Sequence, residues 1–71
     1  MNAKVDLEKI KLCMFLNKHT NRFMANYLEL SETGWHNKKN GLYPLNAIEI
    51  KKIADLYRVP VDELYKKSNV G

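Results

Sequence analysis

The sequence lacks most features that would indicate a membrane protein or a disulfide-stabilised secreted domain. It has 71 residues, a single cysteine, and no apolar run near the ~20 residues that a membrane-spanning helix needs. Cys13 alone cannot form an intramolecular disulfide, so packing must stabilise the fold, and a reducing cytoplasm suits such a protein. Asp6 and Glu8 lie where a signal peptide would be basic and then apolar. We therefore expect one cytoplasmic domain over residues 1–71, with loose tails at 1–5 and 66–71.

Groups suited to catalysis or metal binding are also scarce. The 2 histidines, His19 and His36, have no cysteine or carboxylate partner at a metal-ligand spacing. Cys13 lies on the apolar side of a helical pattern, where a buried and inert thiol is expected. No glycine-rich phosphate loop follows a strand pattern. We expect neither an enzyme nor a bound metal or cofactor.

What the sequence does contain is a series of short helical patterns, with no strand pattern and no repeat. A residue suited to N-capping precedes each of them: Asp6, Thr20, Ser31, Asn46 and Asp62. The helices expected after these caps lie at about residues 7–18, 21–29, 32–40, 47–57 and 63–65. Glu49 completes a capping box with Asn46, and Gly41 is a natural end for the third helix. The prediction is a compact all-α domain of about five helices.

Apolar residues at helical spacing predict a single core. The core positions are Leu7, Ile10, Cys13, Met14, Met24, Ala25, Leu28, Trp35, Ala47, Ile50, Ile53, Ala54 and Tyr57. Leu12 and Phe15 point to another side of the first helix, which is more apolar surface than one face needs. Either later segments cover them or they form a contact surface for another protein.

The stretch Thr20–Lys39 divides at Glu29–Ser31 into two short helical patterns with almost nothing between them. Ala25 is small where two crossing helices must approach closely, and Trp35 points inward from the second pattern. Two helices joined by a tight turn, the second one polar and outward-facing, are typical of a helix-turn-helix unit.

The outward side of the third predicted helix is rich in short hydrogen-bonding side chains and nearly free of large aliphatic ones. The residues expected to face DNA bases are Glu32, Thr33, His36, Asn37 and Asn40. Such a helix fits the major groove, where Asn can pair with adenine, Thr can meet a thymine methyl group and Glu can accept from cytosine. The alternative for any one of these residues is an ordinary solvated helix face.

Residues around this face are expected to contact phosphates and so fix the register on DNA. They are Asn21, Arg22, Lys38 and Lys39. The net charge of +4 permits a polyanionic partner without requiring one. Lys38 lies three residues after Trp35, where an apolar residue is expected, so its stem should follow the core edge while its ammonium reaches out.

The segments T-N-R-F-M-A-N-Y-L-E-L-S-E-T-G-W-H-N-K, E-I-K-K-I-A-D-L-Y-R-V and V-D-E-L-Y together resemble the Cro/repressor-type (Xre-like) helix-turn-helix family. The resemblance is to small repressor-like proteins of phages and prophages in particular. It implies a five-helix domain, lambda-repressor-like, that binds double-stranded operator DNA with its third helix, usually as a homodimer. By position it places Asn21 where the family often has a backbone-contacting glutamine, and it adds Ser31 to the reading-helix residues. Glu29 and Lys38 depart from the family pattern, which usually has a glycine and an apolar residue there.

We therefore expect a sequence-specific DNA-binding transcriptional regulator, most simply a repressor that blocks promoter access. The alternatives are the antidote half of a toxin–antitoxin pair, which would share this domain, and a protein-interaction module without an operator. Neither a membrane nor a small-molecule substrate is expected as a partner.

A single reading helix contacts too few base pairs to select one site, so a weak homodimer completed on the operator is expected. Its first candidate surface is the segment Val59–Tyr65, because Val61, Leu64 and Tyr65 should not all turn inward from so short a helix. Leu12 and Phe15 are the second candidate.

Overall fold

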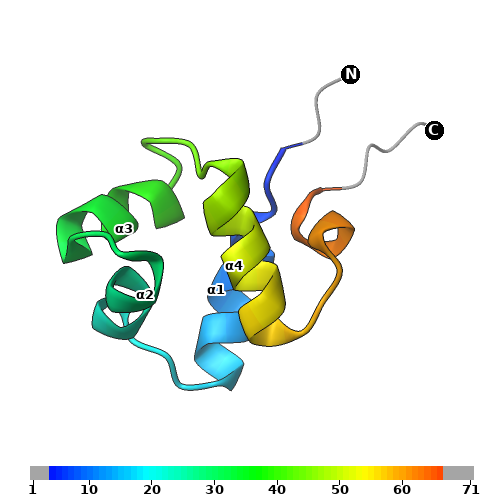
Figure 1. Cartoon of the computed structure of the whole chain (residues 1–71), viewed down its shortest axis with the longest axis horizontal. Coiled ribbons are helices and arrows are strands. Elements are labelled where there is room, and N and C mark those ends of the chain that lie inside the picture. The colour runs from blue at the N-terminus through cyan, green and yellow to red at the C-terminus, as the bar shows by residue number, and fades with distance from the viewer. Residues whose placement is uncertain (1–3, 67–71) are drawn as a thin grey trace.

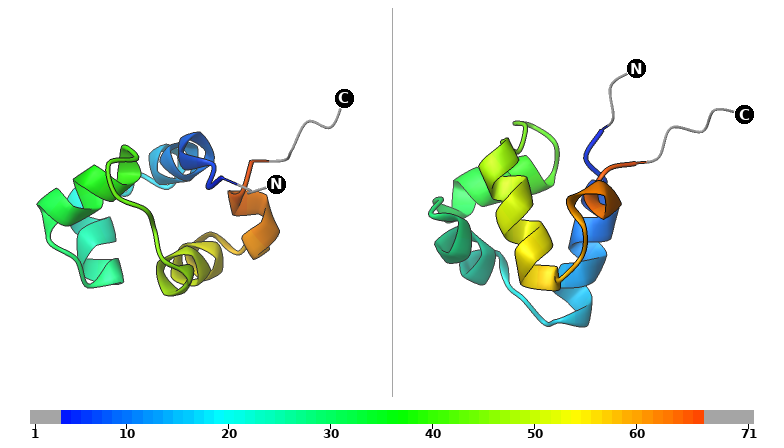
Figure 2. Two further views of the ribbon diagram at one scale, coloured as in Figure 1. Left: turned by 90° about the horizontal axis from the view of Figure 1, so that it is seen from above. Right: turned by 45° about the vertical axis from the view of Figure 1, so that its right-hand side comes forward.

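The computed structural model describes residues 4–66, and over this range the protein is all-α, as predicted. It has the four α-helices α1 (Leu7–Leu16), α2 (Asn21–Leu28), α3 (Glu32–Lys39) and α4 (Ala47–Tyr57), followed by the 3-10 turn η1 (Val61–Leu64). Helices α2 and α3 lie at one end of the longest axis, and η1 lies at the other end (Figure 1). The first and last described residues, Lys4 and Lys66, lie side by side near η1 (Figure 2). None of the helices within the described residues has the length and apolar character needed to cross a membrane.

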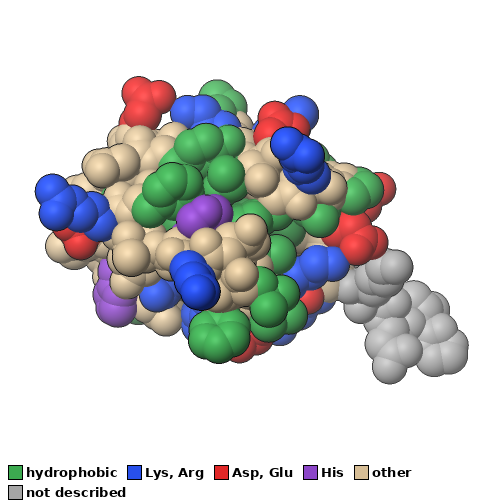
Figure 3. Space-filling model, turned by 90° about the horizontal axis from the view of Figure 1, so that it is seen from below, with side chains coloured by type: hydrophobic (Ala, Val, Ile, Leu, Met, Phe, Trp, Pro, Cys, Tyr) green, Lys and Arg blue, Asp and Glu red, His purple; other side chains and the backbone are tan. Residues whose placement is uncertain are grey.

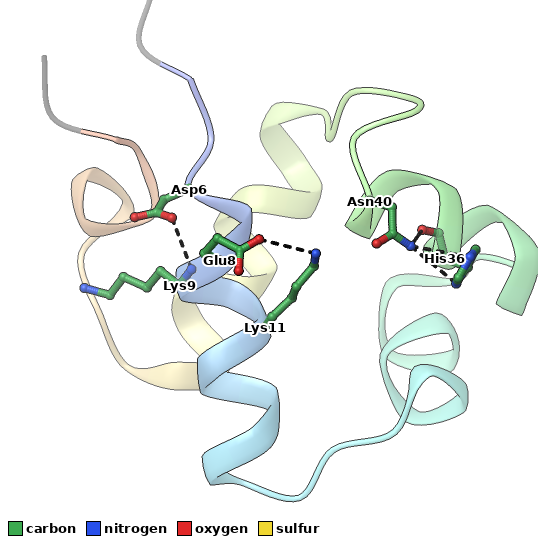
Figure 4. Close-up of polar contacts among 6 residues, drawn as sticks. All are labelled: Asp6, Glu8, Lys9, Lys11, His36 and Asn40. Carbon is green, nitrogen blue, oxygen red and sulfur yellow. Dashed lines mark hydrogen bonds and ion pairs between the residues drawn. The ribbon is translucent and has the colours of Figure 1, made fainter.

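Four of the five predicted caps are confirmed. The side chains of Asp6, Thr20, Ser31 and Asn46 each accept a hydrogen bond from the backbone N–H three residues later, at 3.1, 3.0, 2.9 and 2.8 Å. Figure 4 shows the first of these bonds, from the Lys9 N–H to Asp6. Glu49 returns a bond from its Oε1 to the Asn46 N–H at 2.9 Å, which completes the capping box.

A non-glycine residue with left-handed backbone follows each of the helices α1, α2 and α4; it is the C-cap of α2 and of α4, and in α1 it comes one residue after the C-cap Asn17. Lys18, Glu29 and Arg58 have φ values of 56°, 59° and 55°. Helix α1 therefore stops at Leu16, two residues short of the predicted end at Lys18. The Asn17 side chain donates to the Cys13 carbonyl at 2.8 Å, and the left-handed Lys18 lets the His19 N–H close onto the Met14 carbonyl at 2.9 Å.

The prediction of a fifth α-helix is wrong. Residues Val61–Leu64 form one 3-10 turn, in which Pro60 takes the N-cap position and no side-chain cap is made. Asp62 lies inside the turn instead of capping it. A segment of 4 residues is too short to propagate α-helical hydrogen bonds, so the tighter i→i+3 pattern closes it.

The predicted loose tails are wrong at residues 4, 5 and 66; residues 1–3 and 67–71 lie outside the described range. Val5 and Tyr65 form an isolated antiparallel bridge. The Lys66 N–H donates to the Lys4 carbonyl at 2.7 Å, and the Asp6 N–H donates to the Leu64 carbonyl at 2.7 Å. These bonds attach η1 to the start of α1.

The core runs through all four helices and η1. Its fully buried large side chains are Trp35, Ile10, Met24, Ile53 and Leu64. Two predicted core positions are corrected: Ala47 is exposed and Cys13 is only half-buried. Ala47 begins α4, so its small side chain lies at the edge of the helix bundle.

The two surfaces predicted for a homodimer differ in how exposed their side chains are. Leu64 is fully buried, and Val61 and Tyr65 pack half-buried against the core, so the expectation that these three side chains could not all turn inward is wrong. In a 3-10 turn the side chains at i and i+3 lie on one face, so Val61 and Leu64 turn to the core together. Tyr65 follows the turn in extended backbone, where its bridge to Val5 holds it. By contrast, Leu12 and Phe15 are 54% and 78% exposed, so of the two alternatives for them, coverage by later segments is wrong within residues 4–66.

Candidate functional site

The candidate site is built on α2, α3 and the three-residue connection 29–31 between them. Glu29 reverses the chain with left-handed backbone, and the Leu30 N–H donates to the Ala25 carbonyl at 2.8 Å. Ala25 is 1% exposed, which agrees with its prediction as a small residue between closely packed helices. Ser31 then caps α3 with its hydroxyl, so that oxygen is committed to the Gly34 N–H at 2.9 Å.

Trp35 fixes the rotation of α3 because its side chain is 0% exposed. The polar residues predicted to face bases lie on the remaining surface of the helix. Ser31, Glu32, Thr33, His36 and Asn40 are exposed, and Asn37 is half-buried. This surface is polar and contains no large aliphatic side chain.

Four of the predicted site residues surround one shallow hollow. Glu32, Thr33 and His36 from α3 line it together with Asn21 from the start of α2, and its volume is about 250 Å³. The structure thus brings a predicted phosphate contact next to three predicted base contacts. Glu32 is the one carboxylate among them, and it would repel phosphates unless it lies over bases or in solvent.

Asn40 is bound to its own helix. Its Nδ2 donates to the His36 carbonyl at 2.8 Å and lies 3.4 Å from both ring nitrogens of His36 (Figure 4). Asn40 is also the C-cap of α3. The two side chains therefore form one unit at the C-terminal end of the exposed face.

Lys38 is a correction to the predicted phosphate contacts. Its Nζ donates to both carboxylate oxygens of Glu49 at 2.8 Å, and the two side chains are only 20% and 7% exposed. The ammonium turns toward α4 rather than outward because Glu49 is buried and needs a counter-charge. Lys38 therefore fastens α3 to α4.

Lys39 lies on the opposite flank of Trp35 and points toward α2. Its Nζ donates to Asn21 Oδ1 at 2.9 Å, and the Trp35 indole Nε1 donates to the same oxygen at 3.2 Å. Arg22 is exposed in the first turn of α2. Within residues 4–66 neither Lys39 nor Arg22 is ion-paired, so both charges are available to an external partner.

Sequence reasoning missed two residues that organise this site. Glu49 was predicted as half of a capping box, but its bond to Lys38 depends on how α3 and α4 approach each other. The indole N–H of Trp35 was treated only as part of a core residue. A buried tryptophan normally needs an acceptor for this group, and that rule was the available signal.

Comparisons with protein-family models, with curated proteins and with solved structures gave no significant match for the chain. Within the described residues, no group of three or more His, Cys, Asp or Glu side chains could hold a metal ion.

Proposed function

We propose that the protein binds double-stranded DNA in a sequence-specific way, with α2 and α3 acting as a helix-turn-helix and α3 entering the major groove. A repressor of the Cro/repressor type is the role that this proposal favours. The observation that carries it is the pairing of a polar, exposed α3 face with a rigidly anchored helix: Trp35 is fully buried, and Lys38 and Lys39 bond to neighbouring helices.

The side chains on the α3 face suit base edges. Thr33 and His36 line the hollow beside Asn21, and Asn37 lies one residue further along the helix. Amide, hydroxyl and imidazole groups can form directional hydrogen bonds in the major groove, where each base pair presents a distinct pattern. A rigid helix holds such groups in register at little entropic cost on binding.

The charges beside this face suit phosphates. Arg22, Lys39 and the Asn21 amide lie at the α2 side of α3, where a DNA backbone would pass if α3 lay in the groove. Among the other described cations, four lysines are ion-paired: Lys9, Lys11, Lys51 and Lys52, the last of them to Glu29 in the connection between α2 and α3. Within residues 4–66 no ion pair involves Lys4, Lys18, Arg58 or Lys66. The unpaired charges of Arg22 and Lys39 therefore support DNA through their position beside the polar α3 face, and not through being the unpaired cations of the surface as a whole.

Lys39→Ala should weaken binding to every DNA sequence, because a phosphate contact carries no sequence information. The plot of log affinity against log salt should become shallower by about one ion. Titrations at several salt concentrations by fluorescence anisotropy measure both effects. Lys66→Ala is the matched control, because Lys66 lies beside η1 at the far end of the molecule (Figure 1). An equal loss in both variants would mean that net charge alone drives binding.

Asn37→Ala should reduce affinity for the cognate site by about 1–3 kcal/mol and leave binding to random DNA nearly unchanged. Selection of duplexes from a random pool supplies the cognate site, and competition titrations give the two affinities. Asn26→Ala, at an exposed position of α2, is the control. If Asn37→Ala lowers both affinities equally, Asn37 does not read bases.

A protein-interaction module is the second candidate function, and one observation favours it. Leu12, Phe15 and Leu16 are 54%, 78% and 68% exposed along α1. A separate hydrophobic group surrounds a histidine at the centre of the face that carries the α1–α2 connection (Figure 3), where His19 stacks on Phe23 with ring centroids 4.2 Å apart. Under this alternative the protein would bind no DNA at low salt.

Under the main proposal, the surface of α1 formed by Leu12, Phe15 and Leu16 replaces Val59–Tyr65 as the candidate contact of a weak homodimer. This contact stays a prediction.

A further inference from the structure

The bonds around Asn21 indicate more than a residue near a phosphate. Asn21 Oδ1 accepts from Trp35 Nε1 at 3.2 Å and from Lys39 Nζ at 2.9 Å. An indole N–H and an ammonium can only donate, so the amide atom between them must be the oxygen. An amide oxygen has two lone pairs, and here each has a donor. The acceptor capacity of Asn21 is therefore used up inside the protein.

The other polar group of the Asn21 side chain is Nδ2, which can only donate hydrogen bonds. The planar amide places Nδ2 on the other side of Cγ from Oδ1, and Asn21 lines the hollow at the surface. Phosphate oxygens only accept hydrogen bonds, so an amide held in this orientation matches them, whereas the flipped amide would present an oxygen and repel them. The orientation of this one side chain decides whether the contact is favourable.

We infer that Trp35 is a positioning residue for DNA binding: its indole N–H, together with Lys39, locks the Asn21 amide with the donor side outward. This inference rests on the proposed function, since it assigns a partner to the Nδ2 group. Trp35 is fully buried, so it links the orientation of a surface contact to the packing of the core. Trp35, Asn21 and Lys39 then act as one unit and not as three independent contacts.

The hydrogen bond from Trp35 to Asn21 can be tested without DNA. The chain has a single tryptophan, so its indole N–H gives one resonance in a ¹H–¹⁵N NMR spectrum. Asn21→Ala removes the acceptor, and the indole proton should move upfield, while Asn26→Ala should leave it in place. An indole resonance that does not respond to Asn21→Ala would overturn the inference.

A double-mutant cycle tests the link between Trp35 and DNA binding. The quantity measured is the affinity for a random-sequence duplex of about 20 base pairs at low salt, which is long enough for the phosphate contacts to form. Trp35→Phe keeps an aromatic ring in the core but lacks the N–H, and it should weaken binding about three- to tenfold at an unchanged salt slope. In an Asn21→Ala background the same substitution should have almost no further effect. Melting curves establish that each variant is folded at the titration temperature.

Asn21→Asp gives a variant that leaves the core untouched. Its carboxylate still accepts from Trp35 and Lys39 but offers no outward donor, so it should bind DNA more weakly than the charge-matched control Asn26→Asp. Equal affinities for these two variants, or a Trp35→Phe effect that is the same with and without Asn21, would overturn the inference while the proposed function stands. Failure of the wild-type protein to bind the duplex at all would overturn both.

Discussion

Trp35→Ala should destabilise the domain by about 3–5 kcal/mol, because a fully buried indole is replaced by a cavity. A chain of 71 residues has a total stability of roughly 4–11 kcal/mol, so this loss removes much or all of it. The variant should melt more than about 12 °C below the wild type, if it folds at all. Thermal unfolding followed by circular dichroism measures the change.

Phe15→Ala is the control for this prediction. Phe15 is also aromatic but is 78% exposed, so its removal should leave the melting temperature nearly unchanged. If Trp35→Ala melts within a few degrees of the wild type, Trp35 is not in the core in solution. The rotation of α3 would then differ, and its polar face would not be the surface described above.

Lys38→Met should cost about 3 kcal/mol of unfolding free energy. Methionine keeps the apolar stem, but the Glu49 carboxylate, 7% exposed, would lose its counter-charge. The double variant Lys38→Met/Glu49→Gln should recover much of the loss, because glutamine is neutral and its side-chain oxygen can still accept from the Asn46 N–H. Urea unfolding of the single and double variants gives the comparison.

The exposed ion pair between Lys51 and Asp55 provides the matched control. Their side chains are 64% and 60% exposed, and the two residues are one helical turn apart on α4. Lys51→Met should therefore cost no more than about 0.5 kcal/mol. If Lys38→Met costs no more than Lys51→Met, the Lys38–Glu49 pair does not fasten α3 to α4 in solution.

Local features of this fold could be predicted from the sequence because they depend on neighbouring residues. Thr20 and Ser31 each cap a helix through a hydrogen bond to a residue only three positions away in the sequence. The inward position of Trp35 follows from helical periodicity. Contacts between distant segments could not be predicted in the same way. The Val5–Tyr65 bridge joins residues at opposite ends of the chain, and no local pattern specifies it.

The candidate site shows the same division. The polar face of α3 was predictable because the spacing of Thr33, His36 and Asn37 around Trp35 is a property of one helix. The direction of Lys38 was not predictable, since it depends on Glu49 of another helix. Lys38 and Lys39 were both predicted from the sequence to contact phosphates. Their roles differ in the structure because of the way α2 and α4 pack against α3.

The most direct test of DNA binding by the α3 face is an NMR titration of the ¹⁵N-labelled protein with duplex DNA, followed through the backbone amide resonances. The proposal predicts that the largest shifts fall at residues 21–22 and 32–40, and that they weaken as salt is raised. Residues 12–16 of α1 should shift little when the protein is bound to non-specific DNA. An absence of shifts at low salt, or shifts confined to the exposed face of α1 at Leu12, Phe15 and Leu16, would contradict the proposal.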